Sequence, residues 1–187
     1  ILSPLGETIV AAHQIAMSVT SQLFMIPMSL AIALTIRVGT YYGEKNWEAM
    51  RKVQKLGLAT GTVLALMTML LIALFRPEIV AIYTSDHEVS EVAMYLLLFA
   101  LAYQLMDAWQ ISAAGCLRGM QDTKGPMWIT MVAYWIVAFP VSIYLARYTN
   151  IGAAGVWIGL IVGLSVACAL LLLRLYNNNK RLSQDYP

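Results

Sequence analysis

Five long apolar stretches follow one another along the chain, and short polar segments separate them. Each stretch is near the roughly 20 residues that a helix needs to cross the hydrocarbon core of a bilayer. Because a spanning segment must satisfy its backbone hydrogen bonds internally, the pattern predicts an all-α fold, a polytopic transmembrane helical bundle. The predicted spans are residues 8–36, 56–75, 92–114, 127–146 and 151–173.

The composition supports a membrane protein. The chain has 187 residues, of which 60% are hydrophobic and 12% are charged, and its mean hydropathy is +0.69. Soluble domains carry about 25% charged residues. The formal net charge of +2 is too small to indicate a nucleic-acid partner. The opening "ILSPLG" (1–6) has no basic segment or cleavage site of a signal peptide, so we expect a loop between two spans of a longer protein.

The basic residues predict the orientation of the spans, since lysine and arginine gather in cytoplasmic loops. Alternate segments hold ten basic residues against two. The ten are Arg37, Lys45, Arg51, Lys52, Lys55, Arg118, Lys124, Arg174, Lys180 and Arg181, and the two are Arg76 and Arg147. This asymmetry predicts that the N-terminal end lies outside the membrane and that the C-terminus is cytoplasmic.

Two polar segments between spans have local interpretations. "GEKNWEAMRKVQK" (43–55) fits either an interfacial amphipathic helix, with Trp47 and Met50 facing lipid, or a basic loop that only sets the topology. We favour the loop. In "SDHE" (85–88), Ser85 and Glu88 fit a capping box at the start of the third span. Asp86 suits a helix N-terminus, so capping is a better interpretation of it than ligand contact.

Small residues predict where the helices pack, because they let backbones approach in lipid. "GLATG" (57–61) gives one such face, and "GVWIGLIVG" (155–163) gives two consecutive steps of four residues between glycines. Pro27 and Pro140 lie inside predicted spans, where each removes a helical hydrogen bond and favours a bend.

Polar side chains form stripes on two of the predicted spans. Those of the first span fall within about 80° of helical arc. They are Gln14, Ser18, Ser21, Met25 and Ser29, and those of the third span are Tyr103, Asp107 and Gln110, with Gln104 at the edge. Polar stripes facing lipid would be costly, so we expect them to face protein or a water-filled cavity. Amides, hydroxyls, a methionine and one carboxylate suit bulky, partly apolar cations.

Asp107 is the most informative residue of the sequence. An aspartate at the centre of a membrane helix costs about 2.5–3.5 kcal/mol on insertion scales. It could bind and release a proton, or it could ligate Na⁺ together with the Tyr103 hydroxyl one turn away. A structural alternative is a protonated aspartate that is hydrogen-bonded to a neighbouring helix. We favour ion coupling, because ionisable residues inside membranes are functional by default.

An enzymatic function is not indicated. The sequence contains no G-x-S-x-G motif, no P-loop and no cluster of histidine, cysteine and acidic residues at metal-binding spacing. We therefore expect a protein that is not an enzyme and that needs no cofactor.

Three stretches together resemble the multidrug and toxic compound extrusion (MATE) family, in its NorM-like branch. They are "VAAHQIAMSVTSQLFMIPMSLAIALTIRVG" (10–39), "LAYQLMDAWQ" (101–110) and "LRGMQDTKGPM" (117–127). The resemblance runs over essentially the whole chain. It implies that residues 1–187 are about helices eight to twelve of a twelve-helix transporter, within its C-terminal six-helix lobe. The N-terminal lobe and the seventh helix would precede Ile1.

The resemblance implies a cation-coupled antiporter of the bacterial inner membrane, which exports organic cations or drugs in exchange for Na⁺ or H⁺ by alternating access. It assigns the coupling acid to Asp107 and a cation or substrate contact to Tyr103. Gln14 and Ser18 would line the substrate cavity, joined by Gln104 and Gln110 of the second stripe, and Asp86 would be an outer contact for cationic drugs. In the loop motif, Arg118, Gly119, Asp122 and Thr123 would be structural.

Two alternatives remain open. A lipid-linked saccharide flippase of the same superfamily would need a strongly cationic cavity, and the two stripes contain no lysine or arginine. A non-transporting membrane scaffold subunit would tolerate the substitution of Asp107 by asparagine.

Overall fold

The protein is described by a computed structural model that covers residues 6–149 and 153–185. All the regular structure in these residues is helical. The elements are α1 (Glu7–Gly43), α2 (Trp47–Ala81), α3 (His87–Gly119), α4 (Lys124–Val132), the π-helix η2 (Ala133–Ala138), α5 (Phe139–Tyr148) and α6 (Ala153–Asp185). Because α4, η2 and α5 run on without a break, the described residues contain five helices long and apolar enough to cross a membrane.

The five predicted spans are confirmed in number and order, but most of the helices are longer than predicted. Helix α2, for example, begins nine residues before the predicted start of its span at residue 56 and continues to Ala81. Apolar patterning reports only the part of a helix that lies in hydrocarbon, whereas backbone hydrogen bonding continues into polar turns beyond it. Residues 151 and 152 of the fifth predicted span lie outside the described residues.

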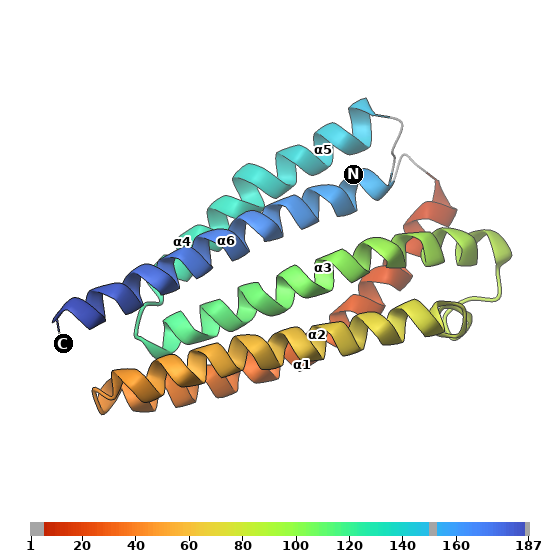
Figure 1. The fold of residues 1–187 in the computed structure, drawn as a ribbon. Coiled ribbons are helices and arrows are strands. Elements are labelled where there is room, and N and C mark those ends of the chain that lie inside the picture. The colour runs from red at the N-terminus through yellow and green to blue at the C-terminus, as the bar shows by residue number, and fades with distance from the viewer. Residues whose placement is uncertain (1–5, 150–152, 186–187) are drawn as a thin grey trace.

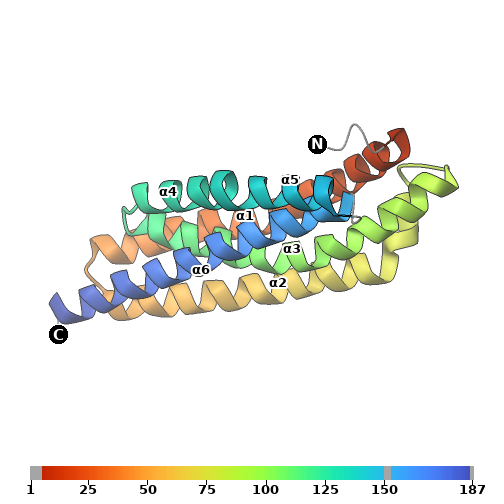
Figure 2. The same ribbon diagram turned by 90° about the horizontal axis from the view of Figure 1, so that it is seen from above.

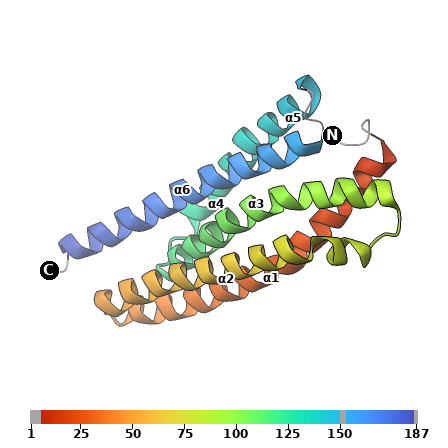
Figure 3. The same cartoon turned by 45° about the vertical axis from the view of Figure 1, so that its right-hand side comes forward.

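The helices form two groups that meet along α3. Helices α1, α2 and α3 lie side by side, and the α4–η2–α5 span runs alongside α6 as the second group (Figure 1). A view turned by 45° shows the same grouping (Figure 3), and seen from above the helices run in a similar direction (Figure 2). Helix α3 contacts α1, α2 and α6. It is therefore the central helix, and its middle is shielded from lipid on several sides.

The basic segments gather at one end of the bundle. The α1–α2 turn, the α3–α4 loop and the end of α6 all lie at the left of Figure 1. These are the segments that hold the ten basic residues, so the fold is consistent with the topology predicted from charge.

Glycines permit the closest helix contacts. A Cβ added at Gly159 would lie 2.6 Å from the backbone nitrogen of Ser142, and one at Gly163 would lie 3.0 Å from the carbonyl oxygen of Ala133. The predicted glycine face of α6 is therefore confirmed as its contact with α5 and η2.

The contact between α1 and α3 depends on two glycines, of which the sequence interpretation named Gly119 as structural and missed Gly115. A Cβ on Gly115 would lie 2.6 Å from the carbonyl oxygen of Ala31, and one on Gly119 would lie 2.7 Å from that of Thr35. The Thr35 hydroxyl donates a hydrogen bond to the Gly115 carbonyl oxygen at 3.0 Å. Backbone therefore meets backbone here, with no space for a side chain.

The prolines have different effects. Helix α1 runs through the buried Pro27 without interruption. In α2 the backbone is non-helical at Phe75 (φ −110°, ψ 22°), two residues before Pro77. Pro140 is the second residue of α5, which begins directly after η2. Since proline cannot donate to the carbonyl four residues earlier, the wider turn of a π-helix accommodates the missing bond.

Two local predictions are wrong. Residues 43–55 form neither the favoured loop nor an interfacial helix of their own, because α2 begins at Trp47, capped by Asn46, and continues as a helix long enough to cross the membrane. Met50 is fully buried and does not face lipid. The cap of α3 is Asp86 and not Ser85, since Oδ1 of Asp86 accepts hydrogen bonds from the Glu88 and Val89 amides at 2.9 and 3.3 Å. The expectation that Asp86 is a cap is confirmed.

Asp122 fastens the α3–α4 loop to α6. Its carboxylate accepts two hydrogen bonds from Arg174, at 2.6 and 3.0 Å, one from Asn178 at 3.1 Å and one from the Gly125 amide at 3.2 Å. The hydrogen bond from Arg174 is the main reason that the pKa of Asp122 lies below its usual value. This clamp agrees with the structural role expected for Asp122.

We predict that Gly115→Ala destabilises the bundle by about 1–3 kcal/mol, because a methyl group in a filled contact forces the helices apart. The matched control is Gly43→Ala at the end of α1, where an added Cβ meets no described atom within 4 Å. Melting temperatures of the two variants in detergent check this. Equal melting temperatures would contradict the tight contact.

We predict that Asp122→Asn lowers the stability by about 1 kcal/mol at neutral pH, since the ion pair is partly open to solvent and is screened. Asp122 has a lowered pKa in the fold, so its contribution is fully present above the ordinary aspartate pKa of about 3.9 and is lost as the pH falls through the lowered value. Melting curves of wild type and Asp122→Asn should therefore differ at pH 7 and converge at the acid end. A constant difference at all pH values would show that the charge is not responsible.

Candidate functional site

Asp107 lies near the middle of α3 and is 3% exposed. Its Oδ2 atom is buried and has no hydrogen-bond partner among the described residues. The side chain lines a cavity of about 470 Å³ between α3 and the α4–η2 segment. A buried acceptor without a donor is costly, so the carboxyl group is suited to take up a proton or a cation from that cavity.

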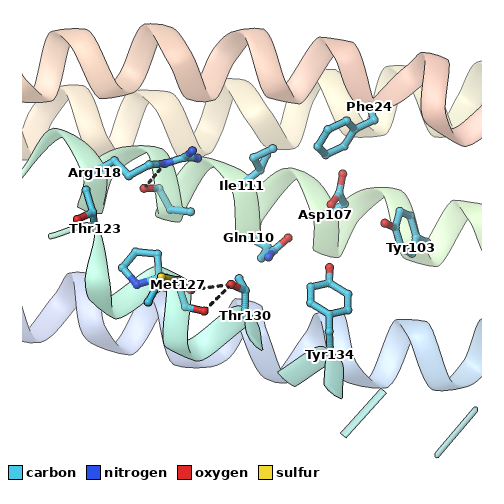
Figure 4. Close-up of a pocket in the computed structure, with 12 residues that line it drawn as sticks. Phe24, Tyr103, Asp107, Gln110, Ile111, Arg118, Thr123, Met127, Thr130 and Tyr134 are labelled. Carbon is cyan, nitrogen blue, oxygen red and sulfur yellow. Dashed lines mark hydrogen bonds between the residues drawn. The ribbon is translucent and has the colours of Figure 1, made fainter. Parts of the chain in front are cut away.

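One face of α3 supplies much of the cavity wall. Its lining residues recur at spacings of three and four, which places them on one side of a helix. They are Tyr103, Asp107, Gln110, Ile111, Ala114 and Arg118. The cavity therefore extends from the buried acid along α3 to the α3–α4 loop, where Arg118 and Thr123 line its other end (Figure 4).

The facing wall comes from the fourth span and was missed by the sequence interpretation. Thr130 on α4 and Tyr134 on η2 line the cavity, and Tyr134 points from η2 toward Asp107 (Figure 4). The next two residues of η2, Trp135 and Ile136, are 70% and 67% exposed. Thr130 and Tyr134 are four residues apart in the span that contains Pro140. This spacing could have identified them in the sequence.

A second cavity, of about 420 Å³, adjoins the first and shares Phe24 and Tyr103 with it. Two residues of the predicted stripe on the first span, Ser21 and Met25, line this cavity. The other lining residues are Met17, Thr20, Trp157 and Leu160. Phenol, indole, methionine and hydroxyl groups thus surround a mainly apolar space.

Trp157 of α6 orients Tyr103 between the cavities. It is 1% exposed, and its ring meets that of Tyr103 edge to face with the centroids 6.3 Å apart. His13 packs against the other side of Trp157, with a centroid distance of 5.8 Å. The tyrosine that sequence analysis paired with Asp107 is therefore held by packing between α3, α6 and α1.

The remaining predicted site residues are not gathered in these cavities. Gln14 is exposed and Ser18 is half-buried on α1, and neither lines the two cavities. Gln104 is 1% exposed and faces a narrow gap beside Pro27, Gly61 and Thr68. Asp86 lies at the exposed N-terminus of α3. The structure thus brings together Tyr103, Asp107 and Gln110.

The larger cavity has few charged residues among those that line it. Asp107 is the one carboxylate and Arg118 the one cation among its described lining residues. In residues 6–149 and 153–185, no group of three or more histidine, cysteine or acidic residues could hold a metal ion. A monovalent ion or a proton fits the single negative charge better than a multivalent metal does.

Comparison with known proteins supports one family. A model of the MatE family matches residues 1–144. The chain is 75% identical over 185 residues to the "Probable multidrug resistance protein NorM" of Acinetobacter baylyi, which covers 99% of this chain and 41% of that protein. It is 43% identical over 181 residues to the "Multidrug resistance protein NorM" of Vibrio vulnificus strain YJ016, which covers 94% of this chain and 40% of the relative.

Solved structures have the same fold. An outward-facing multidrug resistance MATE transporter superposes with a TM-score of 0.88 at 20% identity, over 96% of this chain and 40% of the other. The eukaryotic MATE transporter AtDTX14 gives a TM-score of 0.85 at 22% identity, over 96% of this chain and 41% of the other. The chain spans about two fifths of the length of these relatives. The chain belongs to the MatE family.

Proposed function

We propose that this chain forms most of the C-terminal lobe of a cation-coupled multidrug antiporter, a secondary active transporter and not an enzyme. The observation that carries the proposal is the unpartnered carboxylate oxygen of Asp107, buried in mid-span and lining a cavity. An N-terminal lobe that precedes these residues would supply the other half of the transport path. The relatives' name, multidrug resistance protein NorM, supports drugs as the substrates.

Asp107 couples the ion to the substrate in this proposal. Ionised, it attracts a cationic drug into the adjoining cavities. Occupied by H⁺ or Na⁺, it loses that attraction, so the ion and the drug compete. An ion can drive a conformational change only if it binds the two states with different affinity. The cavity walls come from α3 and from η2, so an ion held between them would bind differently once these elements separate.

Tyr103 and Tyr134 complete the proposed ion site. Both phenol groups share the cavity with Asp107, and Gln110 adds an amide oxygen. Oxygen is the ligand type that hard cations take. The same hydroxyls would hydrogen-bond to a carboxyl group that has bound a proton. This arrangement serves either Na⁺ or H⁺ as the coupling ion.

The second cavity is the proposed drug contact. Aromatic faces attract organic cations, and methionine adapts to irregular ligands. Phe24, Tyr103, Trp157, Met17 and Met25 supply both kinds of surface. Gln14, Ser18 and Gln104 remain proposed lining residues for the complete transporter. Because Oδ1 of Asp86 already caps α3, its role as an outer drug contact also stays a prediction.

The proposed location is a bacterial inner membrane, with the basic end of the bundle in the cytoplasm. The saccharide flippase is the weaker alternative, because a pyrophosphate needs several cations and Arg118 is the one that lines the larger cavity among the described residues.

Asp107→Asn in the full-length protein should reduce ion-driven efflux of a cationic drug by about 5- to 150-fold, the range of typical coupling free energies. The amide cannot exchange a proton and does not carry the charge that attracts a cation. Efflux from cells with matched membrane levels of transporter is the measurement, and the control is Glu44→Gln, at an exposed acid outside the cavities. Unchanged efflux in Asp107→Asn would favour the scaffold subunit and contradict transport through this site.

Tyr134→Phe should raise the Na⁺ or H⁺ concentration needed for half-maximal efflux several-fold and change the maximal rate less. It removes one oxygen from the proposed ion site and keeps the ring. The control is Tyr144→Phe on α5, whose side chain is 62% exposed. Ion titrations of drug efflux distinguish the two variants. The same ion dependence in both would remove Tyr134 from the ion site.

A further inference from the structure

A third cavity lies away from the proposed transport path, at the basic end of the bundle. It has a volume of about 320 Å³ and separates the start of α2 from the end of α6. Three of its lining residues are basic, Arg51 and Lys55 on α2 and Lys180 on α6. Since Arg51 and Lys55 are four residues apart, they share one helix face. The proposed drug and ion sites use none of these residues.

Polar side chains of α2 and α6 form hydrogen bonds at this cavity. The Asn179 amide donates to Oε1 of Gln54 at 2.7 Å, which joins α6 to α2. Gln54 is 2% exposed and also contacts the Met120 sulfur at 3.4 Å. The Arg51 guanidinium donates to the Ser183 hydroxyl. Oδ1 of Asn179 is buried without a hydrogen-bond partner among the described residues. Two hydrogen bonds therefore join α2 and α6 at this cavity.

No described lining residue balances the positive charge of this cavity. Its described lining contains three cations and no carboxylate. The nearest acid on α2, Glu48, is exposed and lies one turn before Arg51. Asp122, which contacts α6 one turn earlier, is already bound to Arg174 and Asn178. Three like charges around one space repel each other unless an anion neutralises them.

The position of the cavity indicates which kind of anion would bind there. Leu56 follows Lys55 on α2 and Leu173 precedes Tyr176 on α6, and their side chains are 57% and 59% exposed. Leucines so exposed on membrane helices are suited to contact lipid tails. Tyr176 lines the cavity and is 65% exposed, as is typical of the aromatic belt at headgroup depth. An anion held here would therefore sit at the headgroup level, within one helical turn of an exposed leucine on each helix.

We propose that this cavity binds the phosphate of an anionic phospholipid from the cytoplasmic leaflet, with its acyl chains along Leu56 and Leu173. Basic pockets between membrane helices on the cytoplasmic side recognise such headgroups. The bound lipid bridges α2 and α6, because Arg51 and Lys55 come from one helix and Lys180 from the other. A free phosphate would satisfy the cations but would leave the leucines without a partner.

The test measures binding of phosphatidylglycerol and of phosphatidylcholine to the full-length protein by native mass spectrometry. The pocket variant is Arg51→Gln/Lys55→Gln/Lys180→Gln. The control variant, Arg37→Gln/Lys52→Gln/Arg181→Gln, removes the same charge from exposed residues outside the cavity. We expect the pocket variant to bind phosphatidylglycerol on the order of a hundredfold more weakly than wild type, from the usual contribution of three basic residues. The control should stay close to wild type.

Several results would overturn the proposal. They are equal losses in the pocket and control variants, no preference of the wild type for phosphatidylglycerol over phosphatidylcholine, or displacement of the lipid by millimolar inorganic phosphate. If the pocket variant fails to fold, the single substitution Lys180→Gln near the end of α6 serves instead. It should weaken phosphatidylglycerol binding about fivefold, and unchanged binding in this variant would also contradict the lipid site.

Discussion

The structure depends on keeping a carboxyl group inside a membrane without a fixed partner. Asp107 is almost completely buried, yet one of its oxygens has no hydrogen-bond partner among the described residues. In hydrocarbon such a group is unfavourable unless protein or a bound ion compensates it. A salt bridge or an amide from a neighbouring helix would have satisfied it permanently. Because it lines a cavity instead, the proposed function assigns it the exchange of one occupant for another.

The packing around α3 makes this arrangement possible. Gly115 and Gly119 bring α1 against the C-terminal half of α3, while Gly159 and Gly163 hold α5 and η2 against α6. The second group of helices therefore stays close to α6, and a cavity remains between α3 and α4. The π-helix before Pro140 changes the direction of side chains on this span. Tyr134 lines that cavity and Trp135 is exposed. π-helical turns often occur at functional sites for this reason.

Sequence patterns predicted most of the fold and half of the candidate site. Apolar length predicted five spans, and lysine and arginine placement predicted an alternation that agrees with the arrangement of the loops in space.

The stripe with Asp107, Tyr103 and Gln110 was found because one helix carries it, so its periodicity is visible in sequence. Tyr134 was missed because its direction depends on a π-helical turn, which changes the usual helical spacing. Gln14 and Gln104 do not line the two cavities, so their proposed roles in the complete transporter stay predictions. Met50 was misplaced because a helix that starts before the membrane buries residues that composition assigns to an interface.

The central claim is that an ion at Asp107 and a cationic drug are exchanged across the membrane. The most direct measurement is drug efflux from proteoliposomes of the full-length protein, with a Na⁺ gradient and a pH gradient imposed separately and without a membrane potential. The account predicts that at least one gradient drives an organic cation against its own concentration difference, and that the drug in turn drives movement of that ion. If neither gradient moves the drug in liposomes that hold folded protein, the antiport account is contradicted.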